Sequence, residues 1–316
     1  LMNYRDLRII FMGTPEFAVA SLDALVHAGC NIVSVITTPD KPAGRGLKLQ
    51  ESAVKKYAVE NNLPVLQPEK LKNPQFLEEL KNLKADLQVV VAFRMLPEVV
   101  WGMPPMGTIN VHGSLLPQYR GAAPINWAII NGEKETGVTT FKLKHEIDTG
   151  DILLQDKFPV NENETAGEVH DHMKEVGAQL LVRTVSGLVE GNLKETPQSS
   201  ISDQSSEIKH APKIFTETCK IDWNKTVDEV HNLIRGLSPF PGAFTFLNDK
   251  TLKIYRSDKE YKQPSIPAGQ FDTDQKSYLK FACTNGYVLV KELQLEGKKK
   301  MNVEDFLRGY RNPQSA

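Results

Sequence analysis

The 316-residue chain has the composition of a folded protein, with 40% apolar residues, 24% charged residues and a formal net charge of -1. These values exclude a disordered chain, a collagen-like chain and a disulfide-rich scaffold. No apolar run reaches the roughly 18 residues of a membrane helix, and the N-terminus lacks the residue order of a signal peptide. We therefore expect a cytoplasmic protein without a membrane partner.

The length predicts two domains, and charge is shared unequally between them. Residues 1–208 carry 20 Lys and Arg against 26 Asp and Glu, whereas residues 209–316 carry 18 against 13. A basic module joined to an acidic one favours a partner such as nucleic acid, although the same charge is equally typical of a solvated surface.

The first elements along the chain predict a parallel α/β sheet. An apolar run over residues 7–12 ends at Gly13, and Thr14-Pro15-Glu16 supplies a helix cap, a first-turn proline and a first-turn acid. A helix over 16–28 and a strand over 31–37 complete a βαβ unit. A nicotinamide enzyme would carry G-x-G-x-x-G at the first turn, where only Gly13 is present, so we expect no nicotinamide cofactor.

Residues 38–50 form a segment rich in Pro and Gly that predicts a loop. It carries three cations, Lys41, Arg45 and Lys48, which suit phosphate oxygens. A mobile, solvated loop is the alternative interpretation.

Further along, the hydrophobic periodicity predicts a mixture of helices and strands up to residue 190. Helices are expected over 52–62, 74–84, 123–131 and 165–190, and strands over 63–66, 86–93, 108–112, 137–143 and 152–155. The polar stretch 191–209 has no periodicity and predicts a linker. After it we expect one helix and four short strands, over 226–237, 243–247, 251–255, 278–283 and 287–293. This pattern favours an OB-like β-barrel.

Neither cysteines nor paired histidines indicate a metal site. Cys30, Cys219 and Cys283 are far apart and lack metal-ligand spacing, so buried or incidental thiols are the better interpretation. His170 and His172 are two residues apart on a predicted helix and would face different sides of it. We therefore expect no metal.

The strand over 108–112 has a polar face. Alternation places Asn110 and His112 on one side and Ile109 and Val111 on the other. Gly113 then breaks the strand and opens a loop. In open α/β sheets ligands bind outside the carboxyl ends of the strands, so we expect chemistry here.

Asn110, His112 and Asp148 together offer an amide donor, a proton acceptor and a carboxylate. Acyl transfer to an amine needs a donor for the developing oxyanion and a group that takes the amine's proton. Ser114 lacks the G-x-S-x-G context of a nucleophile, so a covalent intermediate is not expected. From spacing alone, the Asn and His are as often a packed structural pair, and the Asp could simply cap a turn.

The run Asn110-Val111-His112-Gly113-Ser114-Leu115-Leu116-Pro117, with the later Asp148-Thr149-Gly150, resembles the signature of the 10-formyltetrahydrofolate-dependent formyltransferase family. The resemblance extends over most of the chain. Other similar stretches are 9–17, 38–46, 120–125 and 221–223.

This resemblance implies a Rossmann-like formyltransferase domain over 1–190, a linker over 191–209 and a C-terminal, tRNA-binding β-barrel domain over 210–316. It implies that 10-formyltetrahydrofolate is the co-substrate and that methionyl-initiator tRNA, used in translation initiation, is the acceptor. We expect a monomer. By likeness to the family, Asn110 binds the formyl oxygen, His112 assists proton transfer and Asp148 holds or tunes the histidine.

The resemblance also assigns binding residues. Those expected to bind folate are Phe93, Met95, Leu96, Ser114, Leu115, Leu116 and Pro117, and those expected to bind tRNA are Lys41, Arg45, Lys48 and Lys213. Arg94 departs from the family, since many relatives carry glycine there. The alternatives are a formyltransferase acting on a sugar nucleotide or on glycinamide ribonucleotide, a folate-hydrolysing domain, and a non-catalytic tRNA-binding protein.

Overall fold

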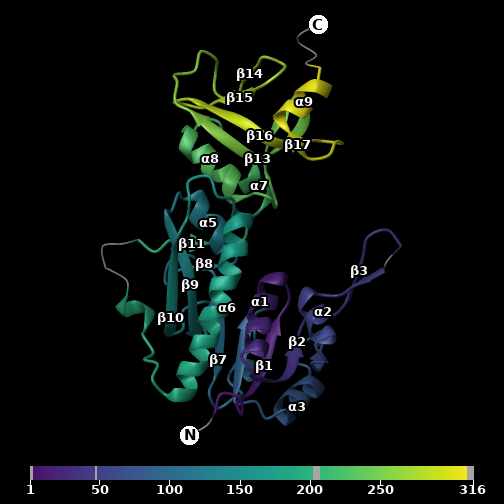
Figure 1. Ribbon diagram of the computed structural model, residues 1–316, viewed down its shortest axis with the longest axis vertical. Coiled ribbons are helices and arrows are strands. Elements are labelled where there is room, and N and C mark those ends of the chain that lie inside the picture. The colour runs from purple at the N-terminus through teal and green to yellow at the C-terminus, as the bar shows by residue number, and fades with distance from the viewer. Residues whose placement is uncertain (1–2, 47, 202–206, 312–316) are drawn as a thin grey trace. The chain divides into compact units, whose positions relative to one another are not determined.

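Figure 1 shows the computed structural model of the chain, which describes residues 3–46, 48–201 and 207–311. The chain divides into two compact units. The first comprises 1–121, 137–158 and 170–209, and the second comprises 122–136, 159–169 and 210–316. Two stretches from the first 190 residues thus belong to the second unit. The domain boundaries expected at residues 190 and 209 stay a prediction.

The first unit is built on a seven-stranded sheet in the order β10-β9-β7-β6-β1-β2-β5. β1 is parallel to β2 and β6, β2 to β5, and β6 to β7, whereas β9 runs antiparallel to β7. The predicted Rossmann-like α/β fold is therefore confirmed. The strands are β1 (Arg8–Gly13), β2 (Asn31–Ile36), β5 (Val65–Leu66), β6 (Leu87–Val91), β7 (Thr108–His112), β9 (Glu135–Lys142) and β10 (Ile152–Pro159).

Helices cover both faces of this sheet. They are α1 (Glu16–His27), α2 (Ala53–Glu60), α3 (Pro74–Asn82), α4 (Glu98–Trp101) and α6 (Ala166–Glu190), with a 3-10 turn η1 at Gln198–Ser200 and a two-residue strand β8 (Arg120–Gly121). Phe76 and Leu80 of α3 share one apolar core with Ile10 and Met12 of β1. Gly13 is needed at the first turn, because a Cβ there would lie 2.7 Å from the carbonyl oxygen of Val91.

The long helix α6 packs against one face of β7, the face opposite to its polar side chains. Gly177 of α6 lies directly against the sheet, since a Cβ there would be 3.3 Å from the side chains of Val111 and Val138. Because neighbouring side chains of a strand alternate, Asn110 and His112 point to the opposite face from Val111. The two polar side chains of β7 are thus turned away from α6.

The segment expected to be a loop over 38–50 is instead a two-stranded antiparallel hairpin, β3 (Lys41–Ala43) and β4 (Lys48–Gln50). Its turn carries Gly44 and Gly46, both in the left-handed region at φ values of +72° and +92°. Glycine populates this region without steric cost. The loop prediction was wrong because a high Pro and Gly content is typical of loops and gave no sign that the residues on the two sides of the turn pair as strands.

Asp40 ties the base of the hairpin to α2 and to the residue that follows β5. Its carboxylate accepts hydrogen bonds from Lys55 Nζ at 2.6 Å and from Gln67 Nε2 at 2.8 Å. These two bonds hold the pKa of the Asp40 carboxyl below its usual value, so the anchor stays charged at neutral pH.

The second unit contains an antiparallel sheet in the order β12-β13-β16-β15-β14, with β17 paired to β16. In the described residues β12 and β14 end the sheet without pairing with each other, and β12 has only an isolated parallel bridge from Phe244 to Lys220 on its outer side, so the predicted OB-like barrel is a curled half-barrel. Its elements are β12 (Ala243–Leu247), β13 (Lys250–Glu260), β14 (Phe271–Thr273), β15 (Leu279–Ala282), β16 (Tyr287–Leu295), β17 (Met301–Asn302), α5 (Pro124–Ile130), α7 (Thr216–Cys219), α8 (Val227–Gly236), α9 (Val303–Gly309) and the short strand β11 (His210–Ala211).

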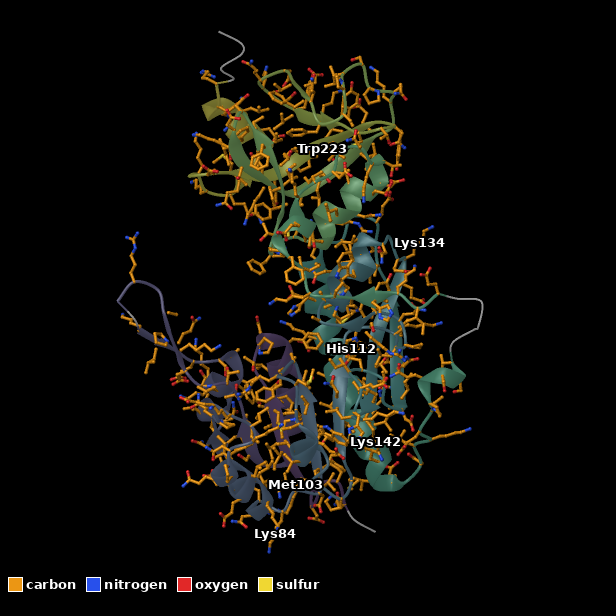
Figure 2. The ribbon with its side chains drawn as sticks, turned by 180° about the vertical axis from the view of Figure 1, so that it is seen from behind. Lys84, Met103, His112, Lys134, Lys142 and Trp223 are labelled. Atoms are coloured by element: carbon orange, nitrogen blue, oxygen red, sulfur yellow. The ribbon has the colours of Figure 1, made fainter. Side chains whose placement is uncertain are left out.

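Apolar side chains from this sheet and its helices form one core. Trp223, labelled in Figure 2, stacks on Phe281 with ring centroids 4.7 Å apart. Val230 and Ile234 of α8 and Phe306 of α9 belong to the same core. Helices therefore cover the inner face of the sheet. The helix α8 begins with a capping box, a motif in which Thr226 and Glu229 bond each other's backbone amides, which fixes its first turn.

Gly150 allows β9 and β10 to approach each other where β10 begins. A Cβ at this position would lie 1.5 Å from the carbonyl oxygen of Lys142, which leaves no room for any other residue. This explains the glycine of the Asp-Thr-Gly motif.

We expect Gly150→Ala to destabilise the protein by about 1–3 kcal/mol or more, since the overlap is with backbone that has to move. Urea unfolding of the two proteins measures the difference. Gly309→Ala is the matched control, because no described atom outside its own helix and chain neighbours lies within 4 Å of its Cβ position. Equal stability of Gly150→Ala and the native chain would contradict this close approach.

Candidate active site

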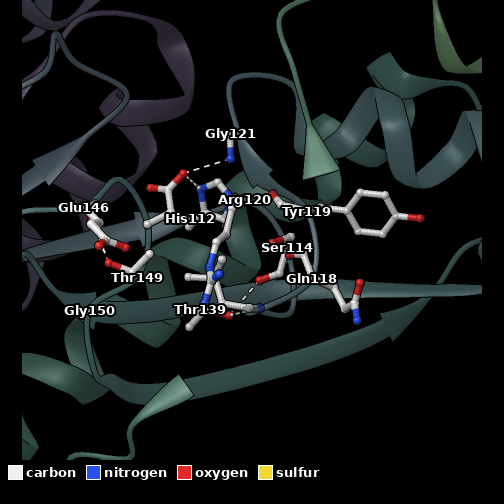
Figure 3. A network of polar contacts seen from close by, with 12 residues as sticks. His112, Ser114, Gln118, Tyr119, Arg120, Gly121, Thr139, Glu146, Thr149 and Gly150 are labelled. Carbon is white, nitrogen blue, oxygen red and sulfur yellow. Dashed lines mark hydrogen bonds and ion pairs between the residues drawn. The ribbon is translucent and has the colours of Figure 1, made fainter. Parts of the chain in front are cut away.

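His112 is the last residue of β7 and its imidazole is almost fully buried, with 8% of its surface exposed. Figures 2 and 3 show it beside the sheet of the first unit. Its Nε2 lies 2.9 Å from the carbonyl oxygen of Tyr119. A carbonyl oxygen only accepts hydrogen bonds, so Nε2 carries the proton and donates it. In the neutral ring the lone pair is then on Nδ1.

Nδ1 faces the carboxylate of Asp148. Oδ2 of Asp148 lies 3.9 Å from His112 Nδ1 and accepts a hydrogen bond from the Gly121 amide at 2.9 Å. The separation from the ring is longer than a hydrogen bond, so the carboxylate acts on the imidazole through its charge. Asp148 has a left-handed backbone with φ +55°, a conformation that Asp tolerates better than most residues. The structure thus brings His112 and Asp148 together from separate segments.

One short segment, 119–121, holds both side chains. Its first residue provides the carbonyl that orients His112, and its last provides the amide that holds Asp148. Figure 3 labels His112 and the three residues of this segment. Between them, Arg120 donates from Nε and a terminal nitrogen to Gln198 Oε1, at 3.1 and 2.8 Å. The position of this segment therefore sets the geometry of the imidazole and carboxylate together.

Gln198 joins this segment to the loop that carries Asp148. The glutamine is 3% exposed, and its Nε2 donates to the carbonyl oxygens of Asp148 and Gly150, each at 2.8 Å. Its amide is thus bonded on both sides, to Arg120 and to the Asp148 loop. It lies in the stretch 191–209, whose polar composition gave no sign of a buried residue, and sequence reasoning missed it.

Asn110 lies two residues before His112 and on the same face of β7. It is half-buried, and its side-chain amide has no hydrogen-bond partner among the described residues. Phe141 pairs with Asn110 across the strands, and its ring centroid is 6.5 Å from that of His112. The face therefore combines an amide free to donate, an imidazole and an apolar wall.

Of the residues expected to bind folate, those of the turn after β7 mainly shape the turn. Ser114 is fully buried, and its Oγ donates to the Gln118 carbonyl at 2.6 Å. Thr139 Oγ1 donates to the Ser114 carbonyl and accepts from the Leu116 amide, at 2.7 and 3.1 Å. Pro117 is buried and Leu115 is half-buried. The folate role of this turn stays a prediction.

The loop after β6 carries the other predicted folate residues. Phe93 is half-buried, Met95 is 71% exposed and Leu96 is buried. Arg94, the departure from the family pattern, donates to the carbonyl oxygens of Pro68 and Glu69 at 2.7 and 2.8 Å, and its guanidinium lies 5.0 Å from the Phe93 ring centroid. Burial lowers the pKa of this guanidinium. Arg94 therefore fastens this loop to the chain after β5.

The residues expected to bind tRNA are all exposed. Lys41, Arg45 and Lys48 share the hairpin β3–β4, and Lys213 lies in the second unit. Their role in binding stays a prediction. Over the described part of the chain, no three His, Cys, Asp or Glu residues are grouped so that they could hold a metal ion. No helix in that part is both long enough and apolar enough to cross a membrane.

Comparison with known proteins identifies the family. Residues 7–185 match the family model described as formyl transferase, and residues 213–311 match the model of the formyl transferase C-terminal domain. A methionyl-tRNA formyltransferase of Phocaeicola vulgatus is 55% identical, and one of Parabacteroides distasonis is 54% identical. Each alignment covers 98% of this chain and 98% of the relative.

Solved structures share the fold at lower identity. An N-formyltransferase of Helicobacter canadensis, in complex with folinic acid and dTDP-3-aminofucose, aligns with a TM-score of 0.68 at 23% identity, over 93% of this chain and all of the other. HypX of Aquifex aeolicus in complex with tetrahydrofolic acid aligns with a TM-score of 0.64 at 19% identity, over 96% of this chain and 48% of the other. By its two family models and its full-length relatives, the chain belongs to the formyl transferase family.

Proposed function

We propose that this protein transfers the formyl group of 10-formyltetrahydrofolate to the free α-amino group of methionyl-initiator tRNA, for translation initiation. The observation that carries the proposal is the His112–Asp148 pair, 3.9 Å apart at the end of β7, beside the amide of Asn110, which bonds none of the residues that the structure describes. This is the set of groups that acyl transfer to an amine requires. Membership of the formyl transferase family identifies the formyl group as the unit that is transferred.

The choice of acceptor rests on similarity and charge. A relative named methionyl-tRNA formyltransferase is 55% identical over 98% of both chains, whereas the aminosugar-bound enzyme is 23% identical. The hairpin β3–β4 carries three exposed cations, which suit the phosphates of an RNA rather than a small acceptor. Folate-bound structures of the same fold support a folate co-substrate.

The reaction is a direct displacement. The α-amine, whose pKa in model peptides is about 7.7–8.0, attacks the formyl carbon as the neutral base. The new bond joins this nitrogen to the formyl carbon, and the bond from that carbon to folate N10 breaks. One amine proton passes to His112 Nδ1 and on to the departing N10, so the products are N-formylmethionyl-tRNA and tetrahydrofolate.

Each of the three side chains has one part in this scheme. The amide of Asn110 donates to the formyl oxygen as its charge develops. His112 accepts the amine proton at Nδ1, because Nε2 is already committed to the Tyr119 carbonyl. The Asp148 carboxylate stabilises the imidazolium that forms, since opposite charges attract strongly at a buried site. Gln198 is a positioning residue that holds the Asp148 loop through two carbonyl oxygens.

The acceptor is tested by presenting the native protein with 10-formyltetrahydrofolate and one acceptor at a time. We expect formylation of methionyl-initiator tRNA, and no comparable rate with an amino-sugar nucleotide or glycinamide ribonucleotide. Product is measured as acid-stable formylmethionine released from the tRNA. A preference for either small acceptor would overturn the assignment, and so would release of formate without any acceptor.

Replacing Asn110 with Ala should lower kcat by about 100- to 1000-fold, the usual loss when one oxyanion donor is removed. The KM for tRNA and the thermal midpoint should change little, because the amide bonds no described residue in the free protein. Steady-state formylation and thermal unfolding measure the two effects. Asn192→Ala is the control, as it removes an exposed amide elsewhere in the same unit. Near-native turnover by Asn110→Ala would refute this role.

Replacing Gln198 with Ala should release the Asp148 loop and lower kcat by about 10- to 100-fold, the loss typical of a supporting contact behind a functional group. KM for both substrates should stay within about twofold of native, and the pH profile of kcat should change because the carboxylate no longer faces His112. A purely structural role predicts a lower melting temperature with kcat and the pH profile unchanged, which would contradict positioning. Ser200→Ala, in the same short turn, is the control.

A further inference from the structure

The loop that carries Asp148 runs over residues 143–151, between β9 and β10. Asp148 holds its inner end in place, through the Gly121 amide and through Gln198. Residues 144–147 form the outer part of the loop, and all four are exposed. Loops that carry function have to be positioned by a rigid scaffold. The outer part of this loop therefore needs an attachment of its own if it is to shape a binding site.

His145 connects the outer part of this loop to α4. Its Nε2 lies 3.5 Å from Oε1 of Glu98, the first residue of that helix. Its ring also packs edge-to-face with the indole of Trp101, the last residue of the helix, with ring centroids 5.2 Å apart. The helix α4 directly follows the loop 93–97, which carries three of the predicted folate residues. His145 thus joins the Asp148 loop to the segment expected to bind folate.

The two segments are also joined at their base by one apolar core. Leu96 is buried in this core, and Phe93 of the same loop packs against it. Trp101 and Leu143, the first residue of the Asp148 loop, pack against the core as well. The Leu143 amide donates to the Thr108 carbonyl of β7 at 2.9 Å. The core therefore fixes both segments where they leave the sheet, and His145 adds a contact beyond it.

Both segments carry exposed apolar side chains. Met95 belongs to the loop after β6, Val99 to α4 and Ile147 to the Asp148 loop, and all three are large and exposed. Exposed apolar side chains beside polar functional groups are typical of a site that a ligand covers. A ligand with an apolar ring system, bound against these segments, would remove such side chains from water.

We propose that His145 is a positioning residue for the folate co-substrate. Its contacts with Glu98 and Trp101, here called the His145 contact, keep residues 144–147 in the conformation that binds folate. The inference rests on the proposed function for the identity of the ligand. Without the His145 contact these residues populate other conformations, and the apparent affinity falls in proportion to the fraction of molecules that stay competent to bind.

The two attachments of the loop have different effects. Gln198 and the Gly121 amide hold Asp148 itself, so they set the geometry of the chemical step. The His145 contact holds residues 144–147 and leaves the Asp148 carboxylate in place. We therefore expect His145 variants to change the KM for folate and not kcat, the reverse of the result expected for Gln198→Ala.

The test compares His145→Ala with His145→Phe, which keeps a ring beside Trp101 but has no nitrogen for Glu98. For His145→Ala, the KM for 10-formyltetrahydrofolate and the Kd of tetrahydrofolate without acceptor should both rise about 3- to 10-fold, as expected when one ring contact and one exposed charge contact are lost. His145→Phe should restore both values to within about threefold of native, since the ring contact is the larger part. The kcat and the KM for tRNA should stay within about twofold of native in both variants.

His172→Ala is the matched control. This histidine is also exposed, and its ring packs edge-to-face on Phe158 with centroids 4.6 Å apart. Phe158 lies near the end of β10, whereas the Asp148 loop precedes the start of that strand. His172→Ala should therefore bind tetrahydrofolate as the native chain does. Melting temperatures check that each variant is folded.

Fluorine NMR of the ligand-free chain, labelled with 5-fluorotryptophan, tests the His145 contact itself. The chain has three tryptophans, at positions 101, 127 and 223. The Trp101 signal, assigned with Trp101→Phe, should move in His145→Ala because the imidazole lies against its indole. The other two signals should stay in place, and all three should stay in place in His172→Ala.

These results separate the role of His145 from the proposed reaction. Tetrahydrofolate binding that weakens in His145→Ala and not in His172→Ala, with no formylation by the native chain, would refute the reaction and leave the positioning role intact. Formylation by the native chain, with the folate KM and the tetrahydrofolate Kd unchanged in His145→Ala, would overturn the positioning role. A loss of kcat at unchanged KM would also overturn it, as would an equal loss of binding in His172→Ala or an unmoved Trp101 signal.

Discussion

The candidate active site depends on one hydrogen bond, from the amide of Gly121 to the Asp148 carboxylate. This bond places a negative charge 3.9 Å from His112 Nδ1, while the Tyr119 carbonyl fixes the proton on the other ring nitrogen. An imidazole oriented in this way can take a proton only on the side that faces the carboxylate. The acid–base chemistry of the site therefore follows from how the segment 119–121 is held.

Several parts of the fold cooperate to hold that segment. The sheet ends β7 at His112, Gly150 allows β10 to run directly against β9, and Gln198 bonds the Asp148 loop and Arg120 at once. Burial strengthens each of these polar contacts, because no water competes for the groups involved. The stretch 191–209 after α6 contains the buried Gln198, so it is not a simple linker throughout its length.

Regular patterns in the sequence were sufficient to predict the α/β sheet and the polar face of β7, since period-two alternation is a local property. The short strands of the second unit also predicted an antiparallel β domain, expected as an OB-like barrel, which the structure shows as a curled half-barrel. The hairpin over 38–50 was missed because its Pro and Gly content is typical of a loop. Gln198, which is 3% exposed, was missed because a single buried glutamine produces no repeating pattern of buried residues. The distance between His112 and Asp148 depends on tertiary packing, which spacing does not encode.

The most direct test of this account is a double-mutant cycle on single-turnover formyl transfer, with His112→Asn, Asp148→Asn and the double variant. If the carboxylate acts only through the imidazole, the double variant should be about as slow as His112→Asn alone, because the two losses are not additive. Asn at position 148 keeps an oxygen for the Gly121 amide, so the loop is preserved. Additive losses would show that Asp148 and His112 act independently, and would contradict the account.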